Sequence, residues 1–508
     1  MADIARSKVM SLWIATADSP QYSRLDGNLE VDVAVIGGGI AGLTAALGLK
    51  RRGLTVAVLE ASRIGTGVTG NTTGKVSSLH RLAYTKLAED HGEDTARAYG
   101  QANEAGLAHV AATVEAEGID CGFRRVTNFT YAEGPEHLAA VRAEAELAAR
   151  LGLPASFTTD VPLPFPVAGA VRFAGQAQFH AVKYLHGLAR AVDGGGSTVV
   201  ERTEVREVRD GTPALAVTDH GTVRARDIVV ATNVPMGDSG RYSGSLTLHR
   251  SYIVASPAEG MPRDSTFISV DEPTRSILTT RENGTDYVLV GGEGHRVSAG
   301  GVDGGAAGGS SADRFERLAR FSRERLGSEH AEYRWSTQDT LPADGLPFAG
   351  LLTPGSRHLY VITGLRKWGL TNGTAAALLV TDAVTGAVSP WATVFDSTRA
   401  VPRPAPAAGT TAEPHLAPWR GLPRLAPKEG AVFDVGGRAT AVYADADGET
   451  HALSARCTHL RCVVEFAPGS GDAPPTWDCP CHGSRYALDG RVIQGPAEKD
   501  LERRPLPG

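Results

Sequence analysis

The sequence predicts a mixed α/β (in part α+β) chain in which a helix-covered parallel sheet, an antiparallel sheet and a small all-β domain are combined. Residues 31–60 hold two apolar runs separated by a glycine-rich turn and an Ala/Leu-rich stretch, the order of a βαβ unit. Residues 246–292 alternate apolar and polar side chains between turns, as antiparallel strands do. Residues 430–508 are turn-rich and β-like, and they follow a proline-rich stretch.

The parallel sheet is predicted to begin with two buried strands. Residues 31–36 and 54–59 are mostly apolar, and the Ala/Leu-rich helix between them ends at about Arg52. Parallel strands need a crossover of this kind. A Rossmann-type domain is therefore expected at this end of the chain.

The turn after the first strand has the pattern Gly37-x-Gly39-x-x-Gly42, and the second strand ends at Glu60. Gly37 permits the tight turn, Gly39 lets the backbone approach a pyrophosphate, and Gly42 lets the helix pack closely on the strand. The helix N-terminus then presents free N–H groups to the phosphates. The predicted dinucleotide contacts are Gly37, Gly39, Ile40, Ala41, Gly42 and, for the ribose hydroxyls, Glu60.

The rest of the chain is divided from its periodicity and composition. Helices are expected at 93–118, 135–152, 180–193, 311–327 and 371–386, and strands at 197–208, 214–218, 223–231 and 358–363. Seven prolines lie within 402–427, a semi-rigid linker composition. The expected domains are a large dinucleotide-binding unit at 1–400 (βαβ at 31–60, antiparallel strands at about 246–330), a linker at 401–427 and a small domain at 428–508.

Charge and hydropathy exclude several classes of protein. The 508 residues include 51 Lys or Arg and 57 Asp or Glu, a formal charge of −6, so no basic surface for nucleic acid is expected. No run of about 18 apolar residues predicts an integral membrane segment. The first 20 residues lack the features of a secretory signal, and a cytoplasmic protein is expected.

Cysteines and histidines cluster at the C-terminal end. Four of the five cysteines lie within 457–481, in the motifs Cys457-x-His459 and Cys479-x-x-His482. Two thiolates and two imidazoles on two loops form a metal-ligand set, which zinc also accepts. Zinc does not require the two further cysteines or the Gly-Ser after the second histidine, so an iron–sulfur centre is favoured.

FAD and NAD share the glycine fingerprint. Its letters recur only at Gly65-x-Gly67-x-x-Gly70, within the same N-terminal region, and no second nucleotide-binding unit is recognised further along the chain, so a resident FAD reduced by an organic substrate is expected. Residues 31–390 resemble the FAD-dependent oxidoreductases typified by D-amino-acid oxidase, sarcosine oxidase and glycine oxidase. The resemblance is carried by residues 35–42, 229–233, 334–339, 344–347 and 364–373. It implies flavin contacts at Asn71, Thr72, Thr73, Val205, Gly369, Leu370 and Thr371.

The same resemblance implies an enzyme that oxidises a small amine or amino-acid-like substrate, with little acid–base machinery. No catalytic residue is marked. The candidates for a catalytic role are His80, Tyr252, His295 and Lys367. The candidates for binding a substrate carboxylate are Arg250, Tyr252, Arg281 and His295. Oxidases of this family often carry a lysine near the flavin. Residues 287–296, where this lysine is sought, contain none, which favours a dehydrogenase. Lys367, elsewhere in the sequence, is the one lysine that argues against this.

The C-terminal segment resembles a Rieske [2Fe–2S] domain of the disulfide-containing type. The resemblance implies that Cys457 and Cys479 bind one iron, and His459 and His482 the other. It pairs Cys462 with Cys481 in a disulfide, and it assigns Ser484 and Tyr486 as donors to the cluster, which raise its potential. Arg461 replaces the usual glycine, which puts the exact cluster potential in question.

Together these features predict a dehydrogenase that passes electrons singly to an acceptor protein or a quinone-like acceptor. Three alternatives are weighed. A Rieske oxygenase needs a mononuclear iron site, and no Asp-x-x-His-x-x-x-x-His pattern is found. An NAD(P)H- or partner-fed reductase lacks its second nucleotide motif. An electron-transfer protein with a mainly structural cluster remains open.

Overall fold

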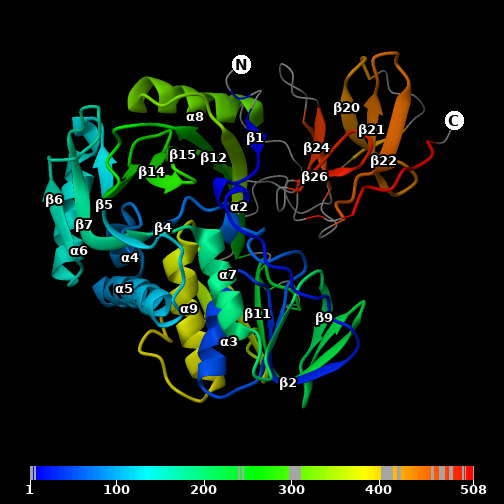
Figure 1. The fold of residues 1–508 in the computed structure, drawn as a ribbon, viewed down its shortest axis with the longest axis horizontal. Coiled ribbons are helices and arrows are strands. Elements are labelled where there is room, and N and C mark those ends of the chain that lie inside the picture. The colour runs from blue at the N-terminus through cyan, green and yellow to red at the C-terminus, as the bar shows by residue number, and fades with distance from the viewer. Residues whose placement is uncertain are drawn as a thin grey trace.

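The computed structural model describes residues 4, 7–237, 241–242, 245–296, 311–401, 416–419, 425–458, 463–467, 475–479, 484–494, 497 and 499–506. Two sheets with a layer of helices between them form the larger part, and the C-terminal strands form a separate small body (Figure 1). The mixed α/β class with a small all-β domain is therefore confirmed.

The first sheet has the strand order β17-β18-β11-β2-β3-β8. Its strands from β18 to β8 are parallel, β17 is an antiparallel edge, and β9 and β10 extend from β11 as an antiparallel ribbon. Their bounds are β2 Leu29–Ile36, β3 Val56–Leu59, β8 Thr198–Val200, β9 Val205–Arg209, β10 Ala214–Thr218, β11 Gly221–Asn233, β17 Phe348–Leu351 and β18 Leu359–Thr363. The expected strand at 197–208 is thus two strands, because the chain turns between them, where Arg202 has a φ of 50°.

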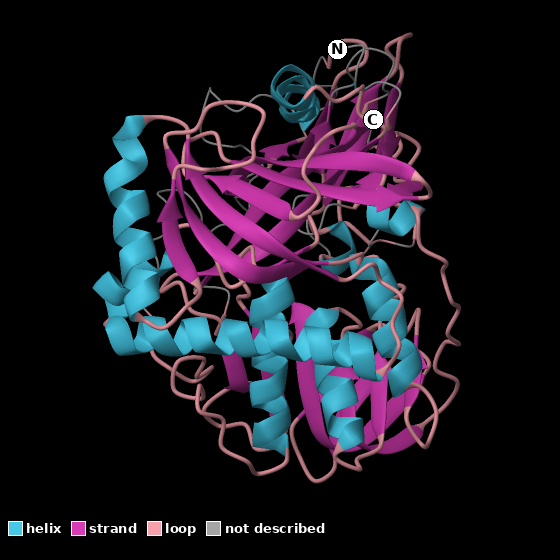
Figure 2. Cartoon of the chain, turned by 60° about the vertical axis from the view of Figure 1, so that its left-hand side comes forward, coloured by secondary structure: helices cyan, strands magenta, loops and turns pink. Residues whose placement is uncertain are grey.

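Helices cover this sheet and separate it from the second one (Figure 2). The described helices are α2 Leu12–Ala15, α3 Ile40–Arg51, α4 Ala83–His91, α5 Glu93–Ala116, α6 Leu138–Arg150, α7 Ala181–Val192, α8 Ser311–Leu326 and α9 Gly369–Val384, with short 3₁₀ turns η1 at Thr69–Asn71 and η2 at Pro135–His137. Of these, α6 and α8 pack on the second sheet. The long helix α5 crosses the first turn of α9 at Gly106, where a Cβ atom would lie 2.8 Å from the Thr371 carbonyl oxygen. Gly106 therefore fixes how closely α5 approaches the start of α9.

The second sheet has the order β1-β16-β12-β15-β14-β13-β5-β7-β4, with β6 added on β7. The bounds are β1 Lys8–Val9, β4 Lys75–Val76, β5 Arg124–Ala132, β6 Ala155–Thr158, β7 Gly169–Gln178, β12 Leu246–Pro257, β13 Ser265–Ser269, β14 Arg275–Glu282, β15 Thr285–Arg296 and β16 Tyr333–Pro342. The sheet thus includes strands from well outside residues 246–330. Low β-propensity hides some of them, since β7 is rich in Gly, Ala and Gln and is specified by its neighbours.

The C-terminal body contains two small sheets around one apolar core. The bounds are β19 Ala417–Pro418, β20 Gly430–Asp434, β21 Ala439–Ala444, β22 Thr450–Ser454, β23 Glu465–Ala467, β24 Thr476–Asp478, β25 Arg485–Tyr486 and β26 Val492–Gln494. Trp477 and Tyr486 are fully buried in this core. Within the described ranges, no helix has the length and apolar character needed to cross a membrane.

Candidate functional site

A cavity of about 930 Å³ lies between the two large sheets. Its floor is formed where β2, β3 and β11 end, at Gly37, Glu60 and Asn233. Its other wall comes from β12, β15 and β16 of the antiparallel sheet. Ligands bind at the carboxyl ends of the strands in open parallel sheets, so this is the position at which a dinucleotide is expected.

The glycine turn has the geometry that its sequence predicts. Gly37 has a φ of 106°, and a Cβ atom there would lie 2.6 Å from the Ala231 carbonyl oxygen. A Cβ atom on Gly42 would lie 2.0 Å from the Gly37 carbonyl oxygen, whereas one on Gly39 would face the cavity and meet only Thr69 Oγ1 at 3.4 Å. Glu60 accepts a 2.7 Å hydrogen bond from the Gly38 N–H, which places its carboxylate beside the turn.

Residues 69–73 form a second wall, held by two buried tryptophans. Trp335 donates to the Asn71 carbonyl at 2.9 Å, and Trp13 donates to the Thr72 carbonyl at 2.8 Å. The Thr69 hydroxyl accepts from the Ile40 N–H at 3.2 Å and so joins this segment to the start of α3. The expected contacts Asn71, Thr72, Thr73 and Val205 all line the cavity.

The first turn of α9 reaches the same cavity. Gly369 and Leu370 line it, while the Thr371 hydroxyl donates to the Ser77 carbonyl at 2.9 Å. His80 stacks on Trp368, and its ring nitrogens lie 2.7 Å from Tyr99 Oη and 2.7 Å from the Ser77 carbonyl oxygen. Burial lowers the pKa of His80 well below 6.5, and Arg366 adds to this. His80 is thus neutral and held by hydrogen bonds inside the protein. These contacts suit a structural role, in which His80 stabilises the start of α9.

Several buried polar atoms on the cavity wall have no hydrogen-bond partner among the described residues. They are Thr337 Oγ1, both side-chain heteroatoms of Gln338, and His249 Nδ1. Buried polar groups are rarely left unsatisfied in a native protein. These atoms, the open face of Gly39 and the N-termini of α3 and α9 fit a polar, phosphate-bearing ligand with an extended ring. FAD therefore fits the residues that are present.

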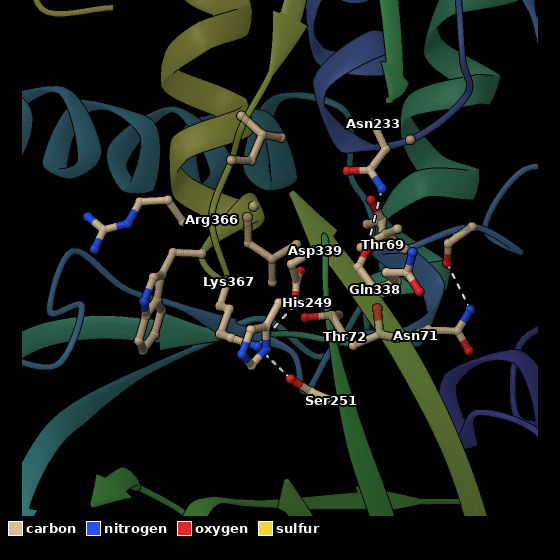
Figure 3. A pocket seen from close by; sticks show the side chains of 18 of the residues that line it. Thr69, Asn71, Thr72, Asn233, His249, Ser251, Gln338, Asp339, Arg366 and Lys367 are labelled. Atoms are coloured by element: carbon tan, nitrogen blue, oxygen red, sulfur yellow. Dashed lines mark hydrogen bonds and ion pairs between the residues drawn. The ribbon is translucent and has the colours of Figure 1, made fainter. Parts of the chain in front are cut away.

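A polar cluster occupies the wall opposite residues 69–73. Lys367 Nζ donates to Ser251 Oγ at 2.6 Å and lies 3.7 Å from Asp339 Oδ2, and His249 lies beside them (Figure 3). Burial raises the pKa of Asp339 to about 6, although Lys367 opposes the shift. Burial, with Lys367 and His295 adding to it, lowers the pKa of His249 to about 3. The pattern of the sequence singled out Lys367 but did not mark the three side chains around it.

A second lysine, Lys75 on β4, also lines the cavity. It is buried, and its Nζ donates to the Phe267 carbonyl at 2.6 Å and to Ser276 Oγ at 2.5 Å. Burial lowers its pKa to about 7. With Lys86, the cavity lining therefore holds three lysines among the described residues, although residues 287–296 contain none, so the lysine argument for a dehydrogenase is weakened.

The other sequence candidates occupy different places. Tyr252 lines the cavity and also contacts Ser311 through its hydroxyl at 3.2 Å, and its ring stacks on His295. Arg281 is exposed and lies 3.8 Å from Asp286. Arg250 does not line the cavity among the described residues; it faces the C-terminal body instead.

The C-terminal body buries two of the expected iron ligands, Cys457 and Cys479. Tyr486 Oη lies 3.1 Å from both Cys457 Sγ and Thr458 Oγ1 and accepts from the Thr458 N–H at 3.1 Å, so the phenol proton can be donated to the sulfur or to the threonine oxygen. Ser484 is buried, and its oxygen accepts from the Ala497 N–H. Buried thiol side chains next to such a donor fit a thiolate-bound cluster. His459, Cys462, Cys481 and His482, with Arg461, lie outside the described residues.

Comparison with known proteins identifies both parts. A family model described as FAD dependent oxidoreductase matches residues 32–383, and one described as Rieske [2Fe-2S] domain matches residues 422–505. The chain belongs to the FAD-dependent oxidoreductase family and carries a C-terminal Rieske domain. It is therefore an oxidoreductase whose cofactors are FAD and a [2Fe–2S] cluster, as the sequence predicts.

Three individual proteins show how the likeness is distributed. The chain is 29% identical over 511 residues, 98% of each chain, to the "Putative Rieske 2Fe-2S iron-sulfur protein YhfW" of Bacillus subtilis (strain 168). It is 30% identical over 223 residues, 43% of this chain and 52% of the other, to the gamma-glutamylputrescine oxidoreductase of Escherichia coli (strain K12). The glycine oxidase structure from Geobacillus kaustophilus shares the fold, with a TM-score of 0.61, 22% identity, and coverage of 74% of this chain and all of the other.

Proposed function

We propose that the protein is a dehydrogenase that oxidises a small amine or amino-acid-like substrate and passes the electrons singly, through its Rieske centre, to an external acceptor. The acceptor belongs to one of two classes, a one-electron acceptor protein or a quinone-like molecule. The observation that carries the proposal is that the cavity and the Rieske domain lie on opposite sides of the same strand, β12.

The substrate class is supported by the likeness to proteins named as glycine oxidase and gamma-glutamylputrescine oxidoreductase. When bound, FAD supplies a two-electron hydride acceptor, and a [2Fe–2S] cluster supplies a one-electron carrier. The oxidation converts a CH–NH unit into a C=N unit and yields two electrons and two protons. Two equivalents of a one-electron acceptor, or one quinone, take up the electrons, and water receives the protons that the acceptor does not bind.

The residues of the polar cluster suit the binding of a protonated amine. A cationic amine must lose a proton before hydride can leave the neighbouring carbon. Asp339, whose pKa burial raises to about 6, is largely ionised at pH 7 and is placed to receive that proton. Lys367 and Ser251 fix the cluster beside it.

The Rieske domain is proposed to be of the disulfide type, with His459 and His482 completing the ligand set and a bond between Cys462 and Cys481. The resemblance of the two Cys/His motifs to those of disulfide-type Rieske domains supports this. A cytoplasmic location is also proposed.

The test is anaerobic stopped-flow mixing of the full-length protein with glycine, sarcosine, L-proline, D-alanine and putrescine in turn. Bleaching of the flavin absorbance followed by reduction of the cluster is the expected result for at least one of them. Bleaching with a cluster that stays oxidised would contradict the proposal. Bleaching by NADH alone, with none of the amines active, would favour a reductase.

A His482→Ala variant distinguishes an electron outlet from a structural cluster. An outlet predicts that flavin reduction by the amine is retained while turnover with an external one-electron dye is lost. A purely structural cluster predicts that both are retained whenever the protein folds.

A further inference from the structure

The strand β12 separates the flavin cavity from the Rieske domain. Side chains alternate between the two faces of a strand. His249 and Ser251 line the cavity, and Arg250 between them points to the other side, where it lines a small cavity together with Asp478 and Arg485 of the Rieske domain. Adjacent residues of β12 therefore face the flavin cavity and the interface with the Rieske domain.

Arg250 binds the Rieske domain at the backbone of an expected iron ligand. Its Nη2 donates a 2.7 Å hydrogen bond to the carbonyl oxygen of Cys479, and the contact is buried. A buried carbonyl needs a donor, and a guanidinium forms a stronger hydrogen bond than a neutral one. The contact therefore fixes the backbone at Cys479 against β12.

We propose that Arg250 is the positioning residue that holds Cys479 at β12 and sets the rate of electron transfer from the flavin to the cluster. The inference rests on the proposed function. From His249 or Ser251, the connection to Cys479 consists of one peptide unit, the Arg250 side chain and one hydrogen bond. Electron tunnelling is faster along bonded paths than across gaps, so loss of this contact slows transfer.

Charge gives Arg250 a second effect that can be measured apart from the rate. Arg250 and Arg485 line a small cavity with Asp478, and the charges of Arg485 and Asp478 both act on Arg334 of β16. Positive charge stabilises the reduced, more negative form of a cluster and so raises its potential. Arg334 provides a matched control, because its charge acts at the same interface whereas the hydrogen bond to the Cys479 carbonyl comes from Arg250.

Each transfer moves one electron from the flavin to the cluster. Two transfers return the flavin to its oxidised form, and its protons leave to water. Between and after them, an external acceptor of the class proposed above reoxidises the cluster.

The experiment compares the full-length native protein with Arg250→Met, Arg250→Lys and Arg334→Met, each loaded with FAD and cluster. A light pulse with 5-deazariboflavin and EDTA starts reduction under anaerobic conditions, and the flavin and cluster absorbances are followed. The first-order phase that is independent of protein concentration reports transfer within one molecule. Potentiometric titration, monitored through the paramagnetic signal of the reduced cluster, gives the midpoint potential of each variant.

We expect Arg250→Met to slow the first-order phase at least tenfold, Arg250→Lys to slow it less, and Arg334→Met to change it less than twofold. The midpoint potential falls in both methionine variants, so the difference in driving force does not explain the difference in rate. Equal rates in Arg250→Met and Arg334→Met would overturn the inference while leaving the proposed function intact. A native protein without the first-order phase would overturn the proposed function and this inference together.

Discussion

The two redox sites are built from different parts of the polypeptide. The flavin cavity is lined largely by backbone and small side chains that come from strands and loops between Gly37 and Leu370. The proposed cluster site depends on four side chains within residues 457–482, of which Cys457 and Cys479 are buried. A site made of backbone is damaged by adding atoms, and a site made of ligands is damaged by removing them. The following predictions test that difference.

Cys457→Ser has the largest expected effect, complete loss of the cluster with the flavin content unchanged. A serine hydroxyl replaces the thiolate that the iron requires. Iron and acid-labile sulfide analysis, with the flavin absorbance as the internal reference, measures both. Cys121→Ser is the control, because Cys121 is buried in the core of the flavin domain. Retention of a native cluster in Cys457→Ser would show that Cys457 is not a ligand.

Gly39→Ala and Gly42→Ala are expected to impair the flavin site for different reasons. A methyl group on Gly42 would lie 2.0 Å from the Gly37 carbonyl oxygen, so the helix must move, at a cost of about 1–3 kcal/mol of folding stability. A methyl group on Gly39 meets only Thr69 Oγ1 at 3.4 Å, so we expect the protein to fold. The methyl group instead keeps the pyrophosphate of FAD from approaching the backbone, which weakens FAD binding.

Thermal unfolding and FAD titration of the apoprotein separate these two effects. Gly42→Ala lowers both the unfolding midpoint and the affinity for FAD. Gly39→Ala keeps the native unfolding midpoint of the apoprotein but weakens FAD binding at least tenfold. A native affinity for FAD in Gly39→Ala would show that the pyrophosphate of FAD does not bind beside Gly39.

The two sites also differ in how much of them the sequence reveals. The glycine turn and the Cys/His motifs are local patterns whose spacing reflects the chemistry directly. The polar cluster is not local, since His249, Asp339 and Lys367 come from β12, β16 and the loop before α9. Arg250 was a candidate for binding substrate, yet the alternation of β12 directs it to the Rieske domain. Trp13 gave no signal either, because its role depends on a loop about 60 residues away.

A pH-dependent prediction concerns Lys75, a buried residue in the wall of the flavin cavity. Burial lowers its pKa from 10.5 to about 7, so between pH 7 and 10.5 the unfolded chain binds a proton that the folded protein does not. The contribution of Lys75 to stability therefore rises with pH, by up to about 1.4 kcal/mol per pH unit. Lys75→Met removes this dependence.

We expect the unfolding midpoint of the native protein to rise relative to that of Lys75→Met as the pH increases from 7 to 9.5. Lys86→Met is the control, because Lys86 is exposed and lies 2.6 Å from Asp90 at the surface. Parallel pH curves for the native protein and Lys75→Met would show that Lys75 stays charged in the folded state.

Tyr486→Phe has the smallest expected effect, since it removes a donor to the cluster but none of its ligands. Tyr486 Oη lies 3.1 Å from Cys457 Sγ, and the Thr458 N–H donates to the same oxygen, which fixes the phenol in place. A hydrogen bond to a sulfur ligand becomes stronger as the cluster gains negative charge, so its loss lowers the midpoint potential, by on the order of 50 mV. Iron content is expected to stay at the native level, in contrast to Cys457→Ser. A potentiometric titration measures the shift, and an unchanged potential would mean that the hydroxyl does not donate to the cluster sulfur.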